Sequence, residues 1–199
     1  MYKLIMDTAS DFYYLGIVKD SEVLKEEYAL GASNHSETMM PSLSKMLDSL
    51  NLKLKDMEEI YTGIGPGSYT GERIAVVIAK MIAIMNKAKL YSFSTLSLIA
   101  SAKDGEVYSL IDARRGNAYM AHFINTKDSI KRLSEDEVIN TEEYFISKED
   151  KKSLIVTSTK PDVIKLLNSD EVKIVSDPSS LSPNYIQLVE AERKRRGLL

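Results

Sequence analysis

Residues 5–18, IMDTASDFYYLGIV, and residues 110–123, LIDARRGNAYMAHF, follow the same plan. In each stretch a short apolar run ends in an aspartate, Asp7 or Asp112, and a polar turn leads to a second run rich in aromatic and aliphatic residues. Short runs of this kind, separated by tight turns, are typical of strands paired in antiparallel hairpins. The two stretches therefore predict two hairpins of one design, one in each half of the chain.

The order of the elements around these hairpins also repeats. In the first half the apolar spacing predicts strands at 2–6, 12–18 and 22–30, and then a helix that Ser33 or Asn34 can cap and whose apolar positions run from Met39 to Leu50. A strand at 59–64, a helix at 71–86, a strand at 90–93 and a helix to about 102 follow. In the second half it predicts strands at 106–111, 117–124 and 129–138, a helix from 141, a strand at 154–157, a helix at 161–167, a strand at 172–175 and a polar helix after Pro183.

Each half thus reads βββαβαβα, which predicts an α/β protein with two duplicated lobes that face each other across a cleft. The boundary is expected near Gly105, which gives an N-terminal lobe over residues 1–103 and a shorter C-terminal lobe over residues 104–199. A single irregular α/β domain is the alternative interpretation.

Composition and charge indicate a globular protein that is expected in the cytoplasm. The 199 residues are 44% hydrophobic and 28% charged, with a net charge of -3. This charge gives no general attraction for nucleic acid, so such a contact needs a local basic patch or a partner. The absence of cysteine excludes disulfides and thiolate metal sites. The longest apolar stretch, residues 74–85, is too short to span a bilayer, and no membrane association is expected.

A glycine-rich stretch between a strand and a helix is the strongest local signal. Residues 63–71 read GIGPGSYTG. Glycines let a backbone approach a ligand closely, and the free amides of the following helix suit an anion. The spacing is neither that of a Walker A loop nor that of a dinucleotide-binding fingerprint. A tight turn whose glycines only permit positive φ is the other interpretation.

The helix at 71–86 has almost no polar face. Small residues recur on it at spacing four, at Gly71, Ala75, Ala79 and Ala83. A helix that is apolar all round is buried all round, so either a partner or the chain's own sheet covers this stripe.

Several polar residues could carry chemistry. Asp7 and Asp112, facing each other, could hold Mg²⁺ for phosphoryl transfer, although an aspartate also suits a hairpin turn. The turn Asp112-Ala113-Arg114-Arg115-Gly116 could bind phosphate or be a solvated turn. His35 and His122 are the only histidines and lie far apart in the sequence, so no metal site is predicted.

In combination these segments resemble the TsaB (YeaZ) family, a paralogue of TsaD in bacterial threonylcarbamoyl-adenosine synthesis. The resemblance rests on residues 5–8 (IMDT), 35–37 (HSE) with Pro41, 65–73 (GPGSYTGER) and 111–116 (IDARRG), and it weakens beyond about residue 125 except at 182–185 (SPNY). Two residues depart from the family's pattern, because Tyr69 stands where Phe is usual and Glu72 where Leu is usual.

The resemblance implies the actin-like ATPase (ASKHA, ribonuclease H-like) fold and a non-catalytic subunit without a metal. It implies pairing with TsaD through two helices of the first lobe, cycling of the complex with the help of TsaE, contact with tRNA through the complex, and a homodimer when the chain is alone. The expected partner interface comprises His35, Glu37, Met39, Leu43, Gly71, Arg73, Ala75, Ala79 and Ala83. No cofactor is expected on this chain alone, and ATP or ADP at a shared interface is left open.

Two other functions remain open from the sequence. The first is a stand-alone ATP-dependent phosphotransferase of actin-like fold that uses Asp7 and Asp112. The second is a homodimeric binding module whose partner is not TsaD. For a nucleotide or a phosphate, the expected loop residues are Asp7, Thr8, Gly65, Gly67, Ser68, Thr70, Asp112, Arg114, Arg115 and Gly116.

Overall fold

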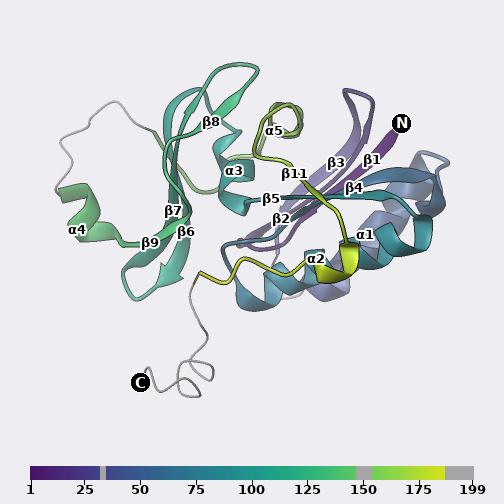
Figure 1. Cartoon of the computed structure of the whole chain (residues 1–199), viewed down its shortest axis with the longest axis horizontal. Coiled ribbons are helices and arrows are strands. Elements are labelled where there is room, and N and C mark those ends of the chain that lie inside the picture. Colours follow the sequence, from purple (N-terminus) through teal and green to yellow (C-terminus); the bar gives the residue numbers. More distant parts are fainter. Residues whose placement is uncertain (32–34, 147–153, 187–199) are drawn as a thin grey trace.

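The structure, a computed structural model, describes residues 1–31, 35–146 and 154–186. Two β-sheets stand side by side, with helices between them and on their outer faces (Figure 1). The first sheet has the strand order β11-β5-β4-β1-β2-β3, and the second has the order β10-β6-β7-β8, with β9 also paired to β7. Among the described helices, none is both long and apolar enough to cross a membrane.

The first sheet combines parallel and antiparallel pairs. β1 pairs with β2, and β2 with β3, as antiparallel hairpins, whereas β1, β4 and β5 run parallel. Parallel neighbours need a crossover, and helices supply it here. The strands are β1 (Tyr2–Asp7), β2 (Phe12–Lys19), β3 (Glu22–Leu30), β4 (Met57–Gly63), β5 (Lys89–Phe93) and β11 (Lys173–Val175).

The second sheet is smaller and is built around one long hairpin. β6 and β7 pair antiparallel along nearly their whole lengths, and the shorter strands flank them. Its strands are β6 (Gly105–Arg114), β7 (Asn117–Asn125), β8 (Ile130–Arg132), β9 (Glu137–Asn140) and β10 (Leu154–Val156).

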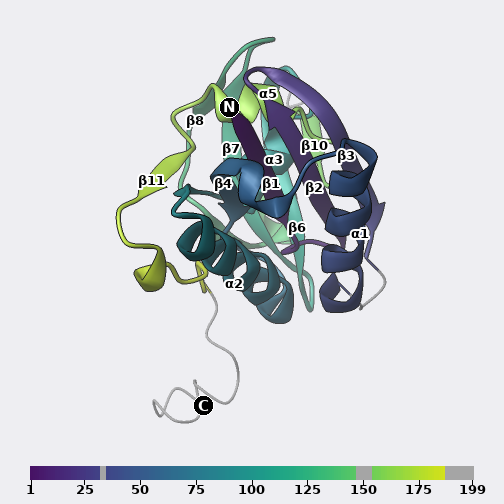
Figure 2. The ribbon, with the colours of Figure 1, turned by 90° about the vertical axis from the view of Figure 1, so that its right-hand side faces the viewer.

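The helices form three layers around the sheets. α1 (His35–Ser49) and α2 (Tyr69–Asn86) cover one face of the first sheet, as Figure 2 shows. α3 (Thr95–Ala100) and α5 (Val163–Leu167) lie in the core shared by the two sheets. α4 (Thr141–Ile146) packs against the outer face of the second sheet. Two short 3₁₀ helices, η1 (Leu54–Asp56) and η2 (Pro178–Ser180), connect the elements.

The first half has the predicted order of elements, and the second half differs in three places. The strand predicted over 129–138 is two strands, β8 and β9, because the chain turns between them and Asp136 folds back onto Arg132. The strand predicted over 172–175 leaves the second half and pairs with β5, where it covers the edge of the first sheet. Residues 181–186 are not helical, and the rest of the predicted tail helix lies outside the described residues.

Candidate functional site

The loop between β4 and α2 packs directly on the turn between β1 and β2. A Cβ atom on Gly67 would stand 2.0 Å from the carbonyl oxygen of Ala9, and one on Gly71 would stand 2.1 Å from that of Thr8. No side chain fits at such distances unless the backbone moves. These two glycines are therefore required by the packing of the chain on itself, whether or not the loop binds a ligand.

Two hydroxyl groups hold the start of α2. Ser68 is its N-cap, and Oγ accepts a hydrogen bond from the amide of Gly71 at 3.3 Å. The buried hydroxyl of Thr8 donates to the carbonyl oxygen of Gly71 at 2.5 Å and accepts from the amide of Ala75 at 3.1 Å. The Thr8 hydroxyl thus joins the first hairpin to α2, and it is already used both as a donor and as an acceptor.

Asp7 is buried at the end of β1. Its carboxylate accepts hydrogen bonds from the hydroxyl of Thr95 at 2.6 Å and from the amide of Ala9 at 3.0 Å. Burial raises the pKa of Asp7 to about 6, and the two hydrogen bonds act in the opposite direction. A Cβ atom on Gly63 would stand 1.6 Å from this carboxylate, so the side chain occupies the space beside β4.

Glu72, in the first turn of α2, turns inward. Only 2% of the residue is exposed, and its Oε1 lies 2.3 Å from where a Cβ atom on Gly65 would stand. Burial raises the pKa of Glu72 to about 8, the amide of Gly67 lowers it, and nearby Asp7 raises it further. Within the described residues Oε2 has no hydrogen-bond partner. The buried carboxyl groups of Asp7 and Glu72 thus lie against Gly63 and Gly65, at the start of the glycine loop.

A cleft of about 640 Å³ lies between the glycine loop and the hairpin of β6 and β7. From the predicted loops it is lined by Gly67, Ser68, Thr70, Gly71, Asp112 and Arg114. The structure therefore brings together one predicted loop from each lobe. The lining also includes Asp11, so carboxylates and a guanidinium group share this space.

Other residues predicted for these loops lie outside the lining of the cleft. They are Asp7, Thr8, Gly65, Arg115 and Gly116. The expected facing pair of Asp7 and Asp112 does not form in the cleft, because Asp7 is buried against α3 while Asp112 is exposed. Asp112 instead accepts a hydrogen bond from the amide of Arg114 at 2.7 Å, which is ordinary turn chemistry.

The turn of the second hairpin is held in a left-handed conformation. Arg114, Arg115 and Gly116 have φ values of 66°, 56° and 76°. This conformation is unusual for a residue other than glycine, and here two arginines adopt it in succession. Arg115 and Gly116 are exposed at the tip of the hairpin, and neither lines the cleft. Within the described residues no three His, Cys, Asp or Glu side chains gather in a way that could hold a metal ion.

The small-residue stripe of α2 faces the chain's own sheet. Gly71 is buried, and Ala75, Ala79 and Ala83 are at most 1% exposed within the core formed with α1 and the first sheet. Met39 and Leu43 of α1 are buried in the same core. These six residues were expected at a partner interface, and that expectation is corrected. The small side chains let the helix lie close to its own sheet.

The remaining predicted interface residues lie at the surface or cannot be placed. Glu37 and Arg73 are exposed, at the starts of α1 and α2 respectively. His35 begins α1, but its side chain is outside the described part of the chain. Of the predicted interface residues, only Glu37 and Arg73 are therefore seen at the surface. The predicted apolar centre is buried in the core and is not available to a partner.

A second apolar surface, made of residues outside the predicted interface, lies on the outer side of α2. Val77, Met81, Ile84 and Met85 are 53%, 53%, 56% and 72% exposed, and we call these four residues the α2 ridge. Their spacing of four, seven and eight residues places them on one helical face. The signal was present in the sequence, because a helix with two apolar faces can bury only one of them against its own sheet.

A family model, two curated relatives and a solved structure all relate this chain to the TsaD, TsaB and YeaZ proteins. A family model described as "TsaD: tRNA N6-adenosine threonylcarbamoyltransferase" matches residues 28–172. The "tRNA threonylcarbamoyladenosine biosynthesis protein TsaB" of Bacillus subtilis is 24% identical over 96% of each chain. Its namesake in Escherichia coli is 29% identical over 68% of this chain and 61% of its own. YeaZ from Pseudomonas aeruginosa has the same fold, with a TM-score of 0.78 at 19% identity over 92% of this chain and 99% of its own.

Proposed function

Since the chain belongs to the family described as TsaD, and among its members to the TsaB (YeaZ) proteins, we propose that it is a non-catalytic partner subunit in the biosynthesis of threonylcarbamoyladenosine in tRNA. Its fold is the actin-like α/β fold of two duplicated lobes. In this proposal the chain pairs with TsaD, and the pair works with TsaE on tRNAs that read codons beginning with A.

The observation that carries the proposal is the α2 ridge. Four large apolar side chains in a row on one helix, each more than half exposed, are costly to leave in water. Covering one such side chain fully contributes about 1.5 to 3 kcal/mol. The ridge therefore supports the docking of a partner along α2.

Other exposed residues of α1 and α2 fit a docking surface with a polar rim. Met40 of α1 is 42% exposed and adds an apolar side chain from the adjacent helix. Glu37 and Arg73 are exposed at the starts of the two helices. Charged groups at the rim of an interface guide association more than they add affinity. In isolation, we expect the same surface to pair with a second copy of the chain.

The polar residues of the first lobe support a structural role for this chain. Asp7 is bonded to Thr95 and Ala9, and Thr8 is bonded to Gly71 and Ala75, so both side chains are used in holding the lobe together. The chemistry of transfer then belongs to the partner. Ser68 and Thr70 line the cleft at the N-terminal end of the docking helix, so ATP or ADP at a shared interface would lie against them.

The proposal is tested by binding and by omission. TsaD from the same source is titrated with the wild-type chain and with Met81→Glu, which places a charge on the ridge. We expect Met81→Glu to weaken binding at least tenfold, about 1.4 kcal/mol or more. Ile174→Glu is the matched control, because Ile174 is 65% exposed on β11, away from α2. Equal affinity of the two variants would contradict the proposed surface.

The omission experiment tests the role itself. tRNA, threonine, bicarbonate, ATP and the other proteins of the pathway are incubated with and without this chain, and the modified adenosine is measured by mass spectrometry. Modification that proceeds equally without the chain would contradict the subunit role. Restoration by the wild-type chain and not by Met81→Glu would join the role to the α2 ridge.

A further inference from the structure

After α5 the chain crosses from the second lobe back to the first. β11 pairs with β5, η2 follows, and residues 181–186 run past α2 toward the glycine loop (Figure 1). The amide of Asn184 donates to the carbonyl oxygen of Ile64 in that loop at 2.7 Å. We call residues 177–186 the strap.

The strap is bonded to the docking helix at two points. Nζ of Lys80 donates to the carbonyl oxygens of Ser179 at 2.7 Å and Leu181 at 2.9 Å. Nε of Arg73 donates to the hydroxyl of Tyr185 at 2.7 Å. The Arg73 guanidinium also lies over the ring of Tyr69, 4.0 Å from its centre, and the two tyrosine rings are 5.0 Å apart. Backbone acceptors and an aromatic pair thus fix both cations of α2.

These two cations lie next to the α2 ridge. Arg73 and Lys80 are each four residues before a ridge residue, Val77 and Ile84, so each pair is on neighbouring turns of one face. The strap therefore forms one border of the docking surface, and α1 lies on the other side of α2 (Figure 2).

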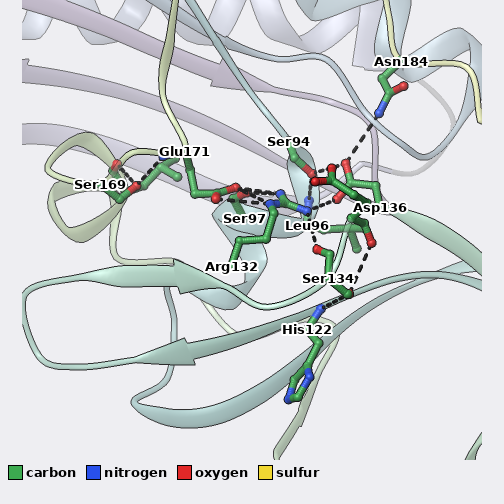
Figure 3. A network of polar contacts seen from close by, with 12 residues as sticks. Ser94, Leu96, Ser97, His122, Arg132, Ser134, Asp136, Ser169, Glu171 and Asn184 are labelled. Atoms are coloured by element: carbon green, nitrogen blue, oxygen red, sulfur yellow. Dashed lines mark hydrogen bonds and ion pairs between the residues drawn. The ribbon is translucent and has the colours of Figure 1, made fainter.

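The other end of this arrangement is a cluster of charges around Arg132 of β8 (Figure 3). Nη2 of Arg132 lies 2.6 Å from the carboxylate of Glu171, and Nη1 lies 2.6 Å from that of Asp136. Nη2 also donates to the hydroxyl of Ser97 in α3 at 2.9 Å. Glu171 follows α5 and precedes β11, so the cluster holds the segment from which the chain returns to the first lobe.

Asp136 joins this cluster to the strap. Its carboxylate accepts a hydrogen bond from Ser94, before α3, at 2.7 Å and one from the side-chain amide of Asn184 at 3.5 Å. The residue after Asn184 is Tyr185, which holds Arg73. A continuous series of contacts therefore leads from β8 of the second lobe to the first turns of α2.

The charged members of this series are well shielded from water. The side chains of Arg132, Asp136 and Glu171 are 19%, 10% and 12% exposed. Charge-assisted hydrogen bonds in such surroundings are strong and directional, and removal of one partner leaves a poorly solvated charge. A shift of the second lobe relative to the first would have to break several of them together.

We propose that the strap couples the second lobe to α2, so that the cluster around Arg132 holds the angle between the lobes and fixes one border of the docking surface. The coupling is a property of this chain alone, and its consequence for docking rests on the proposed function. The strap is then a positioning element that keeps Arg73, Lys80 and the glycine loop in one arrangement.

Hydrogen exchange measured by mass spectrometry tests the coupling on the full chain without a partner. Asp136→Ala removes the carboxylate shared by Arg132, Ser94 and Asn184. We expect amides in residues 64–73 and 177–186 to exchange about fivefold faster or more, although none is close to Asp136 in the sequence. Asp128→Ala, in the exposed turn between β7 and β8, is the control and should leave both segments unchanged.

A second variant tests the contact between the strap and α2. It keeps the proposal testable even if Asp136→Ala misfolds. Tyr185→Phe removes only the hydroxyl that accepts from Arg73, at a half-buried position where the ring can stay. We expect faster exchange in residues 69–75. Changes confined to residues around 94–97 and 132–136 in Asp136→Ala, together with unchanged exchange in Tyr185→Phe, would overturn the coupling.

Binding of the same variants to TsaD separates the two proposals. If the coupling and the proposed function both hold, Asp136→Ala and Tyr185→Phe bind several-fold more weakly than Asp128→Ala. If wild-type chain does not bind TsaD while distant exchange still rises in Asp136→Ala, the proposed function fails and the coupling stands. If exchange rises at the distant segments but affinity is unchanged, the strap does not shape the docking surface, and that part of the inference is wrong.

Discussion

The carboxyl group of Glu72 lies directly against Gly65, so closely that a Cβ atom on Gly65 would stand 2.3 Å from Oε1. The first turn of the docking helix therefore supports the glycine loop through a buried acid. Burial raises the pKa of this acid to about 8, well above its ordinary value of 4.5. The close contact requires glycine at position 65, and the burial of the carboxyl group accounts for the raised pKa of Glu72.

This raised pKa predicts the pH dependence of stability. A carboxyl group whose pKa is higher in the folded chain binds more protons there, so the free energy of unfolding falls as pH rises from about 4.5 to about 8. Glu72→Gln removes this group and should flatten the curve between about pH 6 and 8. Below pH 6 a decline should remain, because burial also raises the pKa of Asp7 to about 6. Urea denaturation at a series of pH values measures this, and an unchanged slope in Glu72→Gln would contradict it.

The contact of the glycine loop with the first hairpin predicts a penalty at Gly67. In Gly67→Ala the new methyl group would stand 2.0 Å from the carbonyl oxygen of Ala9, a backbone atom that cannot rotate away. We expect a loss of about 2 to 4 kcal/mol of stability by thermal or chemical denaturation. Gly105→Ala is the control, because nothing lies within 4 Å of its Cβ position and only the strain of its positive φ remains. A loss at Gly67 no larger than at Gly105 would show that the loop can move aside.

The hydroxyl of Thr8 predicts a second loss of stability. Thr8→Val keeps the shape of the side chain but leaves the carbonyl oxygen of Gly71 and the amide of Ala75 without this partner. A buried hydrogen-bonding group left unpaired costs about 1 to 3 kcal/mol. Thr126→Val, whose hydroxyl is exposed, should lose less than about 0.5 kcal/mol. Comparable urea midpoints for the two variants would mean that water replaces the lost bonds.

The two faces of α2 predict opposite outcomes for one substitution at neighbouring positions. Ala79 is fully buried and Met81 is 53% exposed. Ala79→Glu puts an unpaired charge into the core and should unfold the lobe or lower the free energy of unfolding by several kcal/mol. Met81→Glu should leave the free energy of unfolding nearly unchanged and reduce association. Circular dichroism melting and light scattering distinguish them, and reversed behaviour would mean that α2 is rotated about its axis.

Local sequence pattern was sufficient for much of the fold. The repeated strand-aspartate-turn-strand plan predicted the hairpins of β1 with β2 and of β6 with β7, and Ser68 is a capping residue immediately before α2. These features depend on neighbours in the sequence. The pairing of β11 with β5 depends instead on which sheet edge is left open once the other strands have paired, and short-range periodicity does not contain that information.

The candidate site was predicted in part, for a similar reason. The pattern identified the glycine loop and the second hairpin, and the structure brings Ser68 and Arg114 to one cleft. Pattern alone did not decide which face of an apolar helix is buried, so the small-residue stripe was assigned to a partner. Nor did it predict that Glu72 turns inward, since a charge in the first turn of a helix is favourable in solvent as well. The cluster around Arg132 joins residues from β8, α3 and the segment after α5, and no spacing links them.

The return of β11 to the first sheet has a consequence for how the chain is made. Residues 1–103 leave the ribosome long before Lys173–Val175, so the edge of β5 stays unpaired while the second half is still being synthesised. An open strand edge of this kind attracts other chains. A fragment that ends near residue 103 should therefore aggregate or require a chaperone, and complete protection of the first lobe should appear only after Lys173–Val175 has left the ribosome and paired with β5.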